Sequence, residues 1–330
     1  MSETLTRTLG RSGIEVSALG MGCWAIGGPS WLAPDLPTGY GEVDDTESIR
    51  AIHRALDLGV TLFDTADAYG AGHSERILGQ ALGQQRANVL IATKFGNQFD
   101  EETRMRTGGL SDPQSQVRRS CEASLRRLQT DYIDLYQLHV GDYDLERAVE
   151  VRDILEQLVT EGKIRFYGWS TDDPDRARLF AQGQHCVAVQ HTLNVFEDNP
   201  AILTACEENN LASLNRGPLA MGLLTGKYTA RDQVGELDIR RSSFSWNPFN
   251  AERMPGFLRQ LDKVRQILTR DGRTLAQGAL GWLWAHSGHT IPIPGFKTVQ
   301  QVEENVATMR FGPLTWQQMS EIEQLLRPAF

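Results

Sequence analysis

The residue types best suited to chemistry follow three successive strand-like segments of this 330-residue chain. A carboxylate and a phenol follow the first segment, an amine follows the second and an imidazole follows the third: Asp64, Tyr69, Lys94 and His139. In a parallel barrel the carboxyl ends of the strands share one rim, so these side chains would converge. Each has a structural explanation by itself, such as a turn, packing or a solvated amine. Together, at consecutive strand ends, they favour a catalytic set.

This set suits the reduction of a carbonyl group. Hydride delivered to the carbonyl carbon leaves negative charge on the oxygen, and a proton donor must lie there. An isolated phenol, with a pKa of about 10, is a weak acid at neutral pH, and the Lys94 ammonium is expected to lower the pKa of Tyr69. Asp64 would keep Lys94 charged, and His139 would orient the substrate oxygen.

Eight short β-branched or apolar runs alternate with longer amphipathic segments, a pattern typical of a parallel sheet in an α/β protein. No linker divides the chain, so we predict one domain, residues 1–330, forming a single (β/α)8 TIM barrel with an N-terminal hairpin. The predicted strands are Ala18–Cys23, Leu62–Phe63, Val89–Ala92, Ile133–Leu138, Ile164–Trp169, Val187–Val189, Leu211–Leu214 and Thr290–Ile293.

Helices are predicted where apolar residues recur at helical spacing, as for Ile49, Ile52 and Leu56 and for Val151, Leu155 and Leu158. Asp112-Pro113 and Asp173-Pro174 resemble helix caps. The long loop after the seventh strand, about Thr229–Pro255, lacks periodicity, and loops of this length are often functional. Two helices are expected after the eighth strand, Val299–Met309 and Trp316–Leu326, one more than a minimal barrel needs.

One dinucleotide-binding motif is rejected on its context. Gly20–Ala25 matches G-x-G-x-x-A after a strand, but the motif requires a helix to begin there. The following residues, Ile26–Ser30, include two glycines and a proline and are not expected to form that helix.

The net charge of -9 argues against nucleic acid or an anionic membrane as the main partner. The four cysteines, at positions 23, 121, 186 and 206, lack zinc-ligand spacing, so no metal site is predicted and free thiols in a reducing compartment are expected. Neither a signal peptide nor a transmembrane run is evident, and a cytoplasmic location is expected. The oligomeric state is left open.

The motifs at these strand ends resemble the aldo-keto reductase superfamily, and the resemblance extends from Leu9 to Asn305. Its most specific segments are Phe63-Asp64-Thr65-Ala66 with Tyr69-Gly70, Gly72-His73-Ser74-Glu75, Thr93-Lys94-Phe95-Gly96 and Asp134–His139. The segment Gly222–Tyr228 is most similar to the bacterial branch related to the potassium-channel β-subunits. The resemblance implies a (β/α)8 barrel, NADPH as cofactor and the tetrad Asp64, Tyr69, Lys94 and His139.

The resemblance also implies that Ser170 and Gln190 hold the nicotinamide and that the backbone of 218–222, with Lys227, holds the pyrophosphate. Independently, Gly295 and Lys297 precede a helix, and a glycine, a cation and a helix N-terminus together favour an anion such as a 2′-phosphate. The face formed by Gln301, Glu304 and Asn305 either contacts the adenosine or is solvated. The full cofactor-binding set is Trp24, Asp64, Ser170, Gln190, Arg216, Gly217, Pro218, Leu219, Ala220, Gly222, Lys227, Gly295, Lys297, Gln301, Glu304 and Asn305.

Three positions depart from the family pattern. Arg216 stands where an aromatic ring commonly stacks on the nicotinamide, although a guanidinium can also lie flat on a π-system. Gly217 replaces a frequent serine and Thr171 a frequent asparagine. The loop containing Arg240 and Arg241 either folds over the pyrophosphate or forms an exposed basic turn.

The predicted activity is therefore reduction of a small aldehyde or ketone. The alternatives are oxidation of a sugar or polyol by the same residues and, from a different class, a cofactor-binding regulatory subunit of a membrane channel. Trp24, Trp31, Tyr40 and Phe95 are expected at the pocket rim, which favours aromatic or planar carbonyl compounds.

Overall fold

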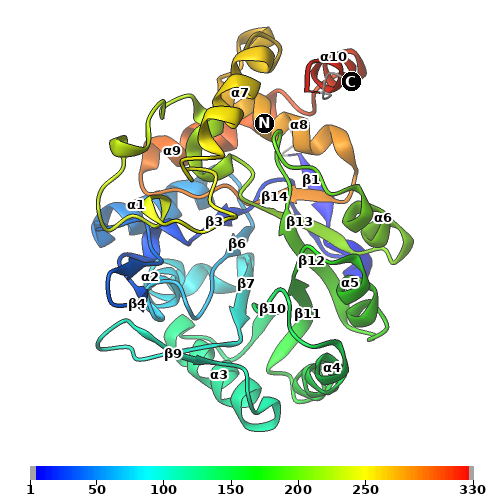
Figure 1. The fold of residues 1–330 in the computed structure, drawn as a ribbon. Helices are drawn as coiled ribbons and strands as arrows, with labels where there is room; N and C mark the ends of the chain where they lie inside the picture. The colour runs from blue at the N-terminus through cyan, green and yellow to red at the C-terminus, as the bar shows by residue number, and fades with distance from the viewer. Residues whose placement is uncertain (1–4, 327–330) are drawn as a thin grey trace.

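The computed structural model describes residues 5–326, so the ends of the predicted domain, 1–4 and 327–330, lie outside the described residues. Its centre is an eight-stranded parallel sheet in the order β3, β6, β7, β10, β11, β12, β13, β14 (Figure 1). Each of the eight predicted strand segments overlaps one of these strands. Their bounds are β3 Met21–Gly22, β6 Leu62–Asp64, β7 Leu90–Phe95, β10 Ile133–Leu138, β11 Ile164–Ser170, β12 Cys186–Thr192, β13 Ala212–Arg216 and β14 Thr290–Pro292.

The two ends of this sheet meet and close a barrel. The backbone N–H of Gly20 donates to Pro292 O at 3.0 Å, and that of Gly22 donates to Pro294 O at 2.9 Å. A Cβ at Gly22 would lie 2.7 Å from Ile293 O, so glycine is required for this close approach. The (β/α)8 prediction is confirmed. The segment after β3 is only a three-residue 3-10 helix, η2 Ala25–Gly27, which agrees with the rejection of the dinucleotide motif.

Helices surround the strands in a ring (Figure 1). Asp44 caps α1 (Asp45–Asp57) and Asp173 caps α5 (Pro174–Ala181) by accepting backbone N–H groups. The Asp112 carboxylate instead accepts from the Ser115 hydroxyl. The predicted helix Val299–Met309 ends earlier, because its last turn is a 3-10 helix, η8 Thr308–Arg310. The helices are α1 Asp45–Asp57, α2 His73–Leu82, α3 Pro113–Leu128, α4 Leu145–Thr160, α5 Pro174–Ala181, α6 Pro200–Glu208, α7 Met254–Leu268, α8 Leu275–His286, α9 Val299–Ala307 and α10 Trp316–Leu326.

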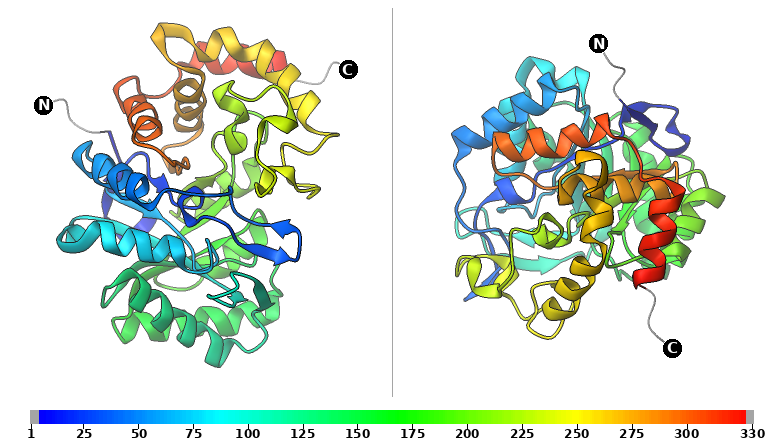
Figure 2. Two further views of the ribbon diagram at one scale, coloured as in Figure 1. Left: turned by 90° about the vertical axis from the view of Figure 1, so that its left-hand side faces the viewer. Right: turned by 90° about the horizontal axis from the view of Figure 1, so that it is seen from above.

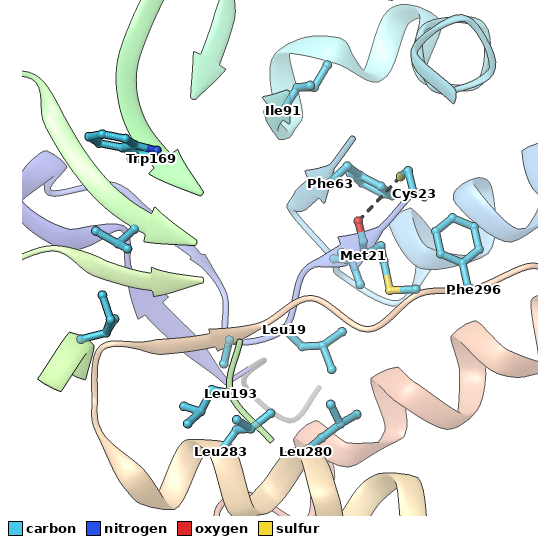
Figure 3. Close-up of a cluster of buried hydrophobic side chains, with 14 of the residues drawn as sticks. Leu19, Met21, Cys23, Phe63, Ile91, Trp169, Leu193, Leu280, Leu283 and Phe296 are labelled. Carbon is cyan, nitrogen blue, oxygen red and sulfur yellow. Dashed lines mark hydrogen bonds between the residues drawn. The ribbon is translucent and has the colours of Figure 1, made fainter. Parts of the chain in front are cut away.

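Two apolar cores hold the barrel together. One fills the space between strands and helices, where Leu280 and Leu283 of α8 point toward Leu19 (Figure 3). The other lies inside the strands and includes Leu9. The predicted N-terminal hairpin, β1 Thr6–Thr8 and β2 Glu15–Ser17, brings Leu9 there and covers the amino-terminal end of the barrel.

The opposite, carboxyl-terminal end carries the longer connections. These are the hairpin of β4 Trp31–Ala33 and β5 Leu36–Pro37, the hairpin of β8 Asn97–Phe99 and β9 Arg106–Gly109, and the long segment after β13. In Figure 2 the blue β4–β5 hairpin and the yellow-green segment after β13 lie at the same end of the molecule. Among residues 5–326, no helix combines the length and the apolar character that a membrane span requires.

Candidate active site

Three of the four predicted catalytic side chains form one buried hydrogen-bonded cluster. The Nζ atom of Lys94 donates to Oδ2 of Asp64 at 2.6 Å, to the Thr65 carbonyl at 2.7 Å and to the hydroxyl of Tyr69 at 3.0 Å. The Nε2 atom of Gln190 donates to Oδ1 of Asp64 at 2.8 Å. The ion pair is excluded from water, because the Lys94 side chain is 0% and the Asp64 side chain 2% exposed.

The parallel strands place these groups side by side. Asp64 at the end of β6 pairs with Ala92 of β7, and Lys94 of β7 pairs with Gln137 of β10, so the three strand ends share one rim. Tyr69 lies on the loop after β6, and the Trp24 ring stacks on it with a centroid separation of 5.7 Å.

The fourth predicted side chain, His139, lies beside the phenol. Its ring meets that of Tyr69 edge to face, with centroids 5.8 Å apart. Burial, together with the charges of Lys94 and Arg216, lowers the pKa of His139 well below its ordinary value. The imidazole is therefore neutral at pH 7 and can donate one hydrogen bond without adding a positive charge.

The pKa of Tyr69 differs from the sequence-based expectation. Burial raises the pKa above the ordinary value of the phenol, and the Lys94 ammonium, which acts in the expected downward direction, only partly offsets this effect. The expected net lowering is therefore wrong for this structure. For Lys94, burial is the largest single influence and acts to lower the pKa, but the adjacent Asp64 carboxylate and the Tyr69 hydroxyl together outweigh it, so the pKa is raised and the amine stays charged. A neutral phenol thus lies against an ammonium.

A cavity of about 1500 Å³ opens at this rim, and Asp64, Tyr69 and His139 line it while Lys94 lies behind them. All sixteen residues of the predicted cofactor-binding set line the cavity. Trp24, Trp31 and Tyr40 also line it, as predicted for the rim. Phe95 does not, and this prediction is wrong. Successive side chains of a strand alternate in direction, so Phe95 points away from Lys94 and stacks on Tyr136 at 4.5 Å.

The predicted anion site at α9 is partly occupied by the protein itself. The Nζ atom of Lys297 donates to the carbonyls of Tyr40 at 2.8 Å and Glu42 at 2.9 Å. The first backbone N–H of α9, on Val299, donates to the carboxylate of Glu47 at 2.9 Å. Lys297 lines the cavity as predicted. The Val299 amide at the start of α9, however, already has an anionic partner in Glu47.

On α9, Gln301, Glu304 and Asn305 all line the cavity, but they are not equivalent. Asn305 is buried, and its amide donates to Gly295 O at 3.4 Å, so it braces the loop before the helix. Gln301 accepts the backbone N–H of Lys297 at 2.7 Å. The face is therefore not simply solvated.

Two arginines of the wall are held by carboxylates. Arg216 pairs with Asp172 and donates to Gln190 O at 3.1 Å, within reach of the Ser170 hydroxyl. Arg240 binds Asp238 through two nitrogens and lies over the Tyr228 ring.

Arg240 and Arg241, in the loop after β13, were expected either to fold over the cofactor pyrophosphate or to form an exposed basic turn. The two arginines differ in this respect. Arg240 lines the cavity, whereas Arg241 lies outside the lining and donates to Val234 O. The backbone at 217–222 adopts left-handed φ at Gly217, Ala220, Met221 and Gly222. Ala220 and Met221 are strained there, and such strain often marks a functional turn.

A sequence model of the aldo/keto reductase family matches residues 18–327. The chain belongs to this family. It is 33% identical over 296 residues to aldo-keto reductase YhdN of Bacillus subtilis, covering 88% of this chain and 85% of that protein. It is 31% identical over 314 residues to the aldo-keto reductase yakc [NADP(+)] of Schizosaccharomyces pombe, covering 92% and 86%. The solved glycerol dehydrogenase AKR11B4 from Gluconobacter oxydans superposes with a TM-score of 0.81 at 30% identity, covering 100% and 98%.

The chain is therefore an oxidoreductase of the aldo-keto reductase type. Of the positions that depart from the family pattern, Thr171 is buried and does not line the cavity, and its hydroxyl donates to Gly141 O at 2.6 Å. The wall also contains residues of the β8–β9 hairpin that are absent from the predicted set, among them Phe99, Arg104 and Arg106. These residues follow the carboxyl end of a barrel strand, and that position alone could have indicated them.

Proposed function

We propose that this aldo/keto reductase reduces an aldehyde or ketone to the alcohol, with NADPH as hydride donor and Tyr69 as proton donor. The observation that carries the proposal is the contact of 3.0 Å between Lys94 Nζ and the Tyr69 hydroxyl at the wall of the cavity. A buried ammonium at this distance stabilises the phenolate that remains after proton donation.

The cavity fits a large anionic cofactor. Its volume of about 1500 Å³ exceeds the upper range of roughly 1,000 Å³ for pockets that hold drug-sized ligands. Its wall carries Lys227, Arg240 and Lys297, and a yeast relative is named for NADP(+). In this proposal Ser170 and Gln190 hold the nicotinamide, the turn at 218–222 and Lys227 hold the pyrophosphate, and Lys297 holds the 2′-phosphate. Bound NADPH supplies the hydride.

The protein residues then handle the proton. Tyr69 donates its hydroxyl proton to the carbonyl oxygen as charge develops there, and Lys94 stabilises the phenolate. Asp64, held by Gln190, keeps Lys94 charged and oriented. His139, neutral because of burial, donates a hydrogen bond that orients the oxygen. General acid catalysis of this kind contributes about 10²–10⁴-fold to the rate.

The second candidate is oxidation of a polyol by the same residues, with Tyr69 accepting the proton. The glycerol dehydrogenase relative favours it. A regulatory-subunit role is less well supported, because the hydrogen-bonded Asp64–Lys94–Tyr69 cluster is complete.

We also propose that residues 1–330 form one domain and that the chain falls in the branch related to the potassium-channel β-subunits. We propose further that it works in the cytoplasm, where the four buried free cysteines would stay reduced.

The test is turnover of a panel of carbonyl compounds, followed at the NADPH absorbance band, in wild type and Tyr69→Phe. We expect Tyr69→Phe to lower kcat by about 10²–10⁴-fold with an unchanged Kd for NADPH. Tyr132→Phe, outside the cavity, is the matched control and should keep wild-type turnover. Comparable turnover in Tyr69→Phe would exclude the phenol as the acid. Glycerol with NADP+, compared with glyceraldehyde with NADPH, tests the direction.

A further inference from the structure

Two arginines of the cavity wall, Arg104 and Arg106, have no carboxylate partner within residues 5–326. Arg104 donates to Pro29 O at 3.4 Å, and Arg106 donates to Gly108 O at 3.2 Å. A guanidinium carries five N–H donors, so most of theirs remain unused. The other arginines of the wall are paired, Arg216 with Asp172 and Arg240 with Asp238.

These arginines lie near the proposed chemistry and away from the proposed 2′-phosphate site. The β8–β9 hairpin that carries them follows directly from β7, the strand of Lys94. The Arg104 guanidinium packs against the segment of Gly28 and Pro29, and the preceding Gly27 contacts the backbone of Tyr69. In Figure 1 the β9 hairpin and α9 occupy different parts of the rim.

Arg104 is held in place rather than free. Its φ of 55° is left-handed, a conformation that a non-glycine residue keeps only when its surroundings enforce it. Its carbonyl accepts the backbone N–H of Trp31 at 3.0 Å, and the neighbouring Met105 accepts that of Asp100 at 2.9 Å. The first bond ties the hairpin to the β4 segment, and the second closes the turn of the hairpin itself. The Arg104 side chain lines the same cavity as Trp24 and Trp31.

We propose that Arg104 and Arg106 form a subsite for a carboxylate on the substrate. The inference rests on the proposed reductase function and specifies its substrate class: an aldehyde or ketone with a planar or apolar body and a carboxylate remote from the carbonyl. The body lies against Trp24 and Trp31, and the carboxylate binds the guanidinium groups, whose planar donors match two carboxylate oxygens. Within residues 5–326, the wall carboxylates that form no ion pair with lysine or arginine, Asp198 and Glu304, lie on other connections, the β12 loop and α9.

The experiment compares 4-carboxybenzaldehyde with its neutral methyl ester in wild type, Arg104→Met, Arg106→Met and the double variant. The measured quantity is the acid-to-ester ratio of kcat/KM, in which the intrinsic reactivity of each aldehyde cancels between proteins. We expect each single variant to lower the ratio by roughly tenfold, the effect of one charge-assisted hydrogen bond, and the double variant to lower it further. Arg119→Met, an exposed arginine outside the cavity, removes the same charge and should leave the ratio unchanged.

An unchanged ratio in both arginine variants overturns the subsite while leaving the proposed reduction intact. Whether the proposed reduction itself holds is decided by the carbonyl panel with Tyr69→Phe. If wild type reduces neither of these two aldehydes, binding of benzoate and benzamide by calorimetry decides the subsite separately. Tighter binding of benzoate that is lost in the double variant supports the carboxylate site, and equal binding of both compounds overturns it. Circular dichroism and Tm of each variant check that the fold is retained.

Discussion

Lys94 shows how tightly the candidate catalytic residues depend on one another. An ammonium has three N–H donors, and here Asp64, the Thr65 carbonyl and Tyr69 accept all three. Removal of Asp64 would leave an uncompensated charge in a site closed to water, which is strongly destabilising. The amine can therefore stay charged beside a phenol only because the carboxylate is present.

At the same scale, Lys297 tests the cofactor preference. We expect Lys297→Ala to weaken NADPH binding by roughly tenfold or more and NADH binding little, since only NADPH carries the 2′-phosphate. The measurement is the Kd of each cofactor by fluorescence quenching. Lys227→Ala, which removes a charge at the proposed pyrophosphate site, should weaken both cofactors alike. Equal losses for NADPH and NADH in Lys297→Ala would refute the phosphate assignment.

Among the elements, the loop that carries Tyr69 is positioned by two glycine segments in contact. Gly70 has a φ of +60°, and a Cβ on it would lie 1.8 Å from Gly27 O. No side chain fits without moving one of the two segments. The position of the phenol relative to Lys94 is thus fixed by backbone contact between the segment after β3 and the loop after β6.

We expect Gly70→Ala to lower turnover strongly while the barrel remains folded. The control is Gly162→Ala, whose φ of +73° imposes similar backbone strain but whose Cβ would meet nothing within 4 Å. Gly162→Ala should lower the free energy of unfolding by about 1–2 kcal/mol and keep normal turnover. Steady-state kinetics and urea denaturation measure both variants. Wild-type turnover in Gly70→Ala would show that the contact between Gly27 and Gly70 does not position Tyr69.

At the level of the whole molecule, net charge and local charge differ in sign. The chain carries a net charge of -9, yet on the wall of its main cavity the cations slightly outnumber the carboxylates. The cations are Arg104, Arg106, Arg216, Lys227, Arg240 and Lys297, and the carboxylates are Asp64, Asp172, Glu197, Asp198 and Glu304. Such a cluster in a cleft attracts anionic ligands even when the rest of the surface does not. The net charge therefore argues against nucleic acid or an anionic membrane as the main partner, but it does not argue against a phosphorylated cofactor.

The stability of the whole fold should fall in mild acid because of a buried histidine. Burial, with the charge of Arg216, lowers the pKa of His191 from 6.5 to about 4. Between pH 6.5 and 4 the unfolded chain binds a proton at this residue that the folded chain does not bind, so the free energy of unfolding decreases as the pH falls. Its contribution is fully present above pH 6.5, and below pH 4 the slope ends.

We expect His191→Gln to reduce this pH dependence by at most about 1.4 kcal/mol per pH unit, the value for one proton. The measurement is urea denaturation of both proteins at several pH values between 4 and 7. Only the difference in slope is diagnostic, because the substitution also changes the hydrogen bond to Ser213 and carboxylates contribute equally to both proteins. Parallel profiles would contradict the assignment.

The order of strands and helices follows from the sequence by itself, because apolar periodicity and strand-end position are local properties of the chain. The same local rule of alternation within β7 could have kept Phe95 out of the predicted rim. Only the tertiary structure decided how charges pair, since the partners are far apart in sequence: Glu47 with the Val299 amide, and Arg216 with Asp172. The direction of the Tyr69 pKa likewise depends on burial, which exists only once the strands have closed around Lys94.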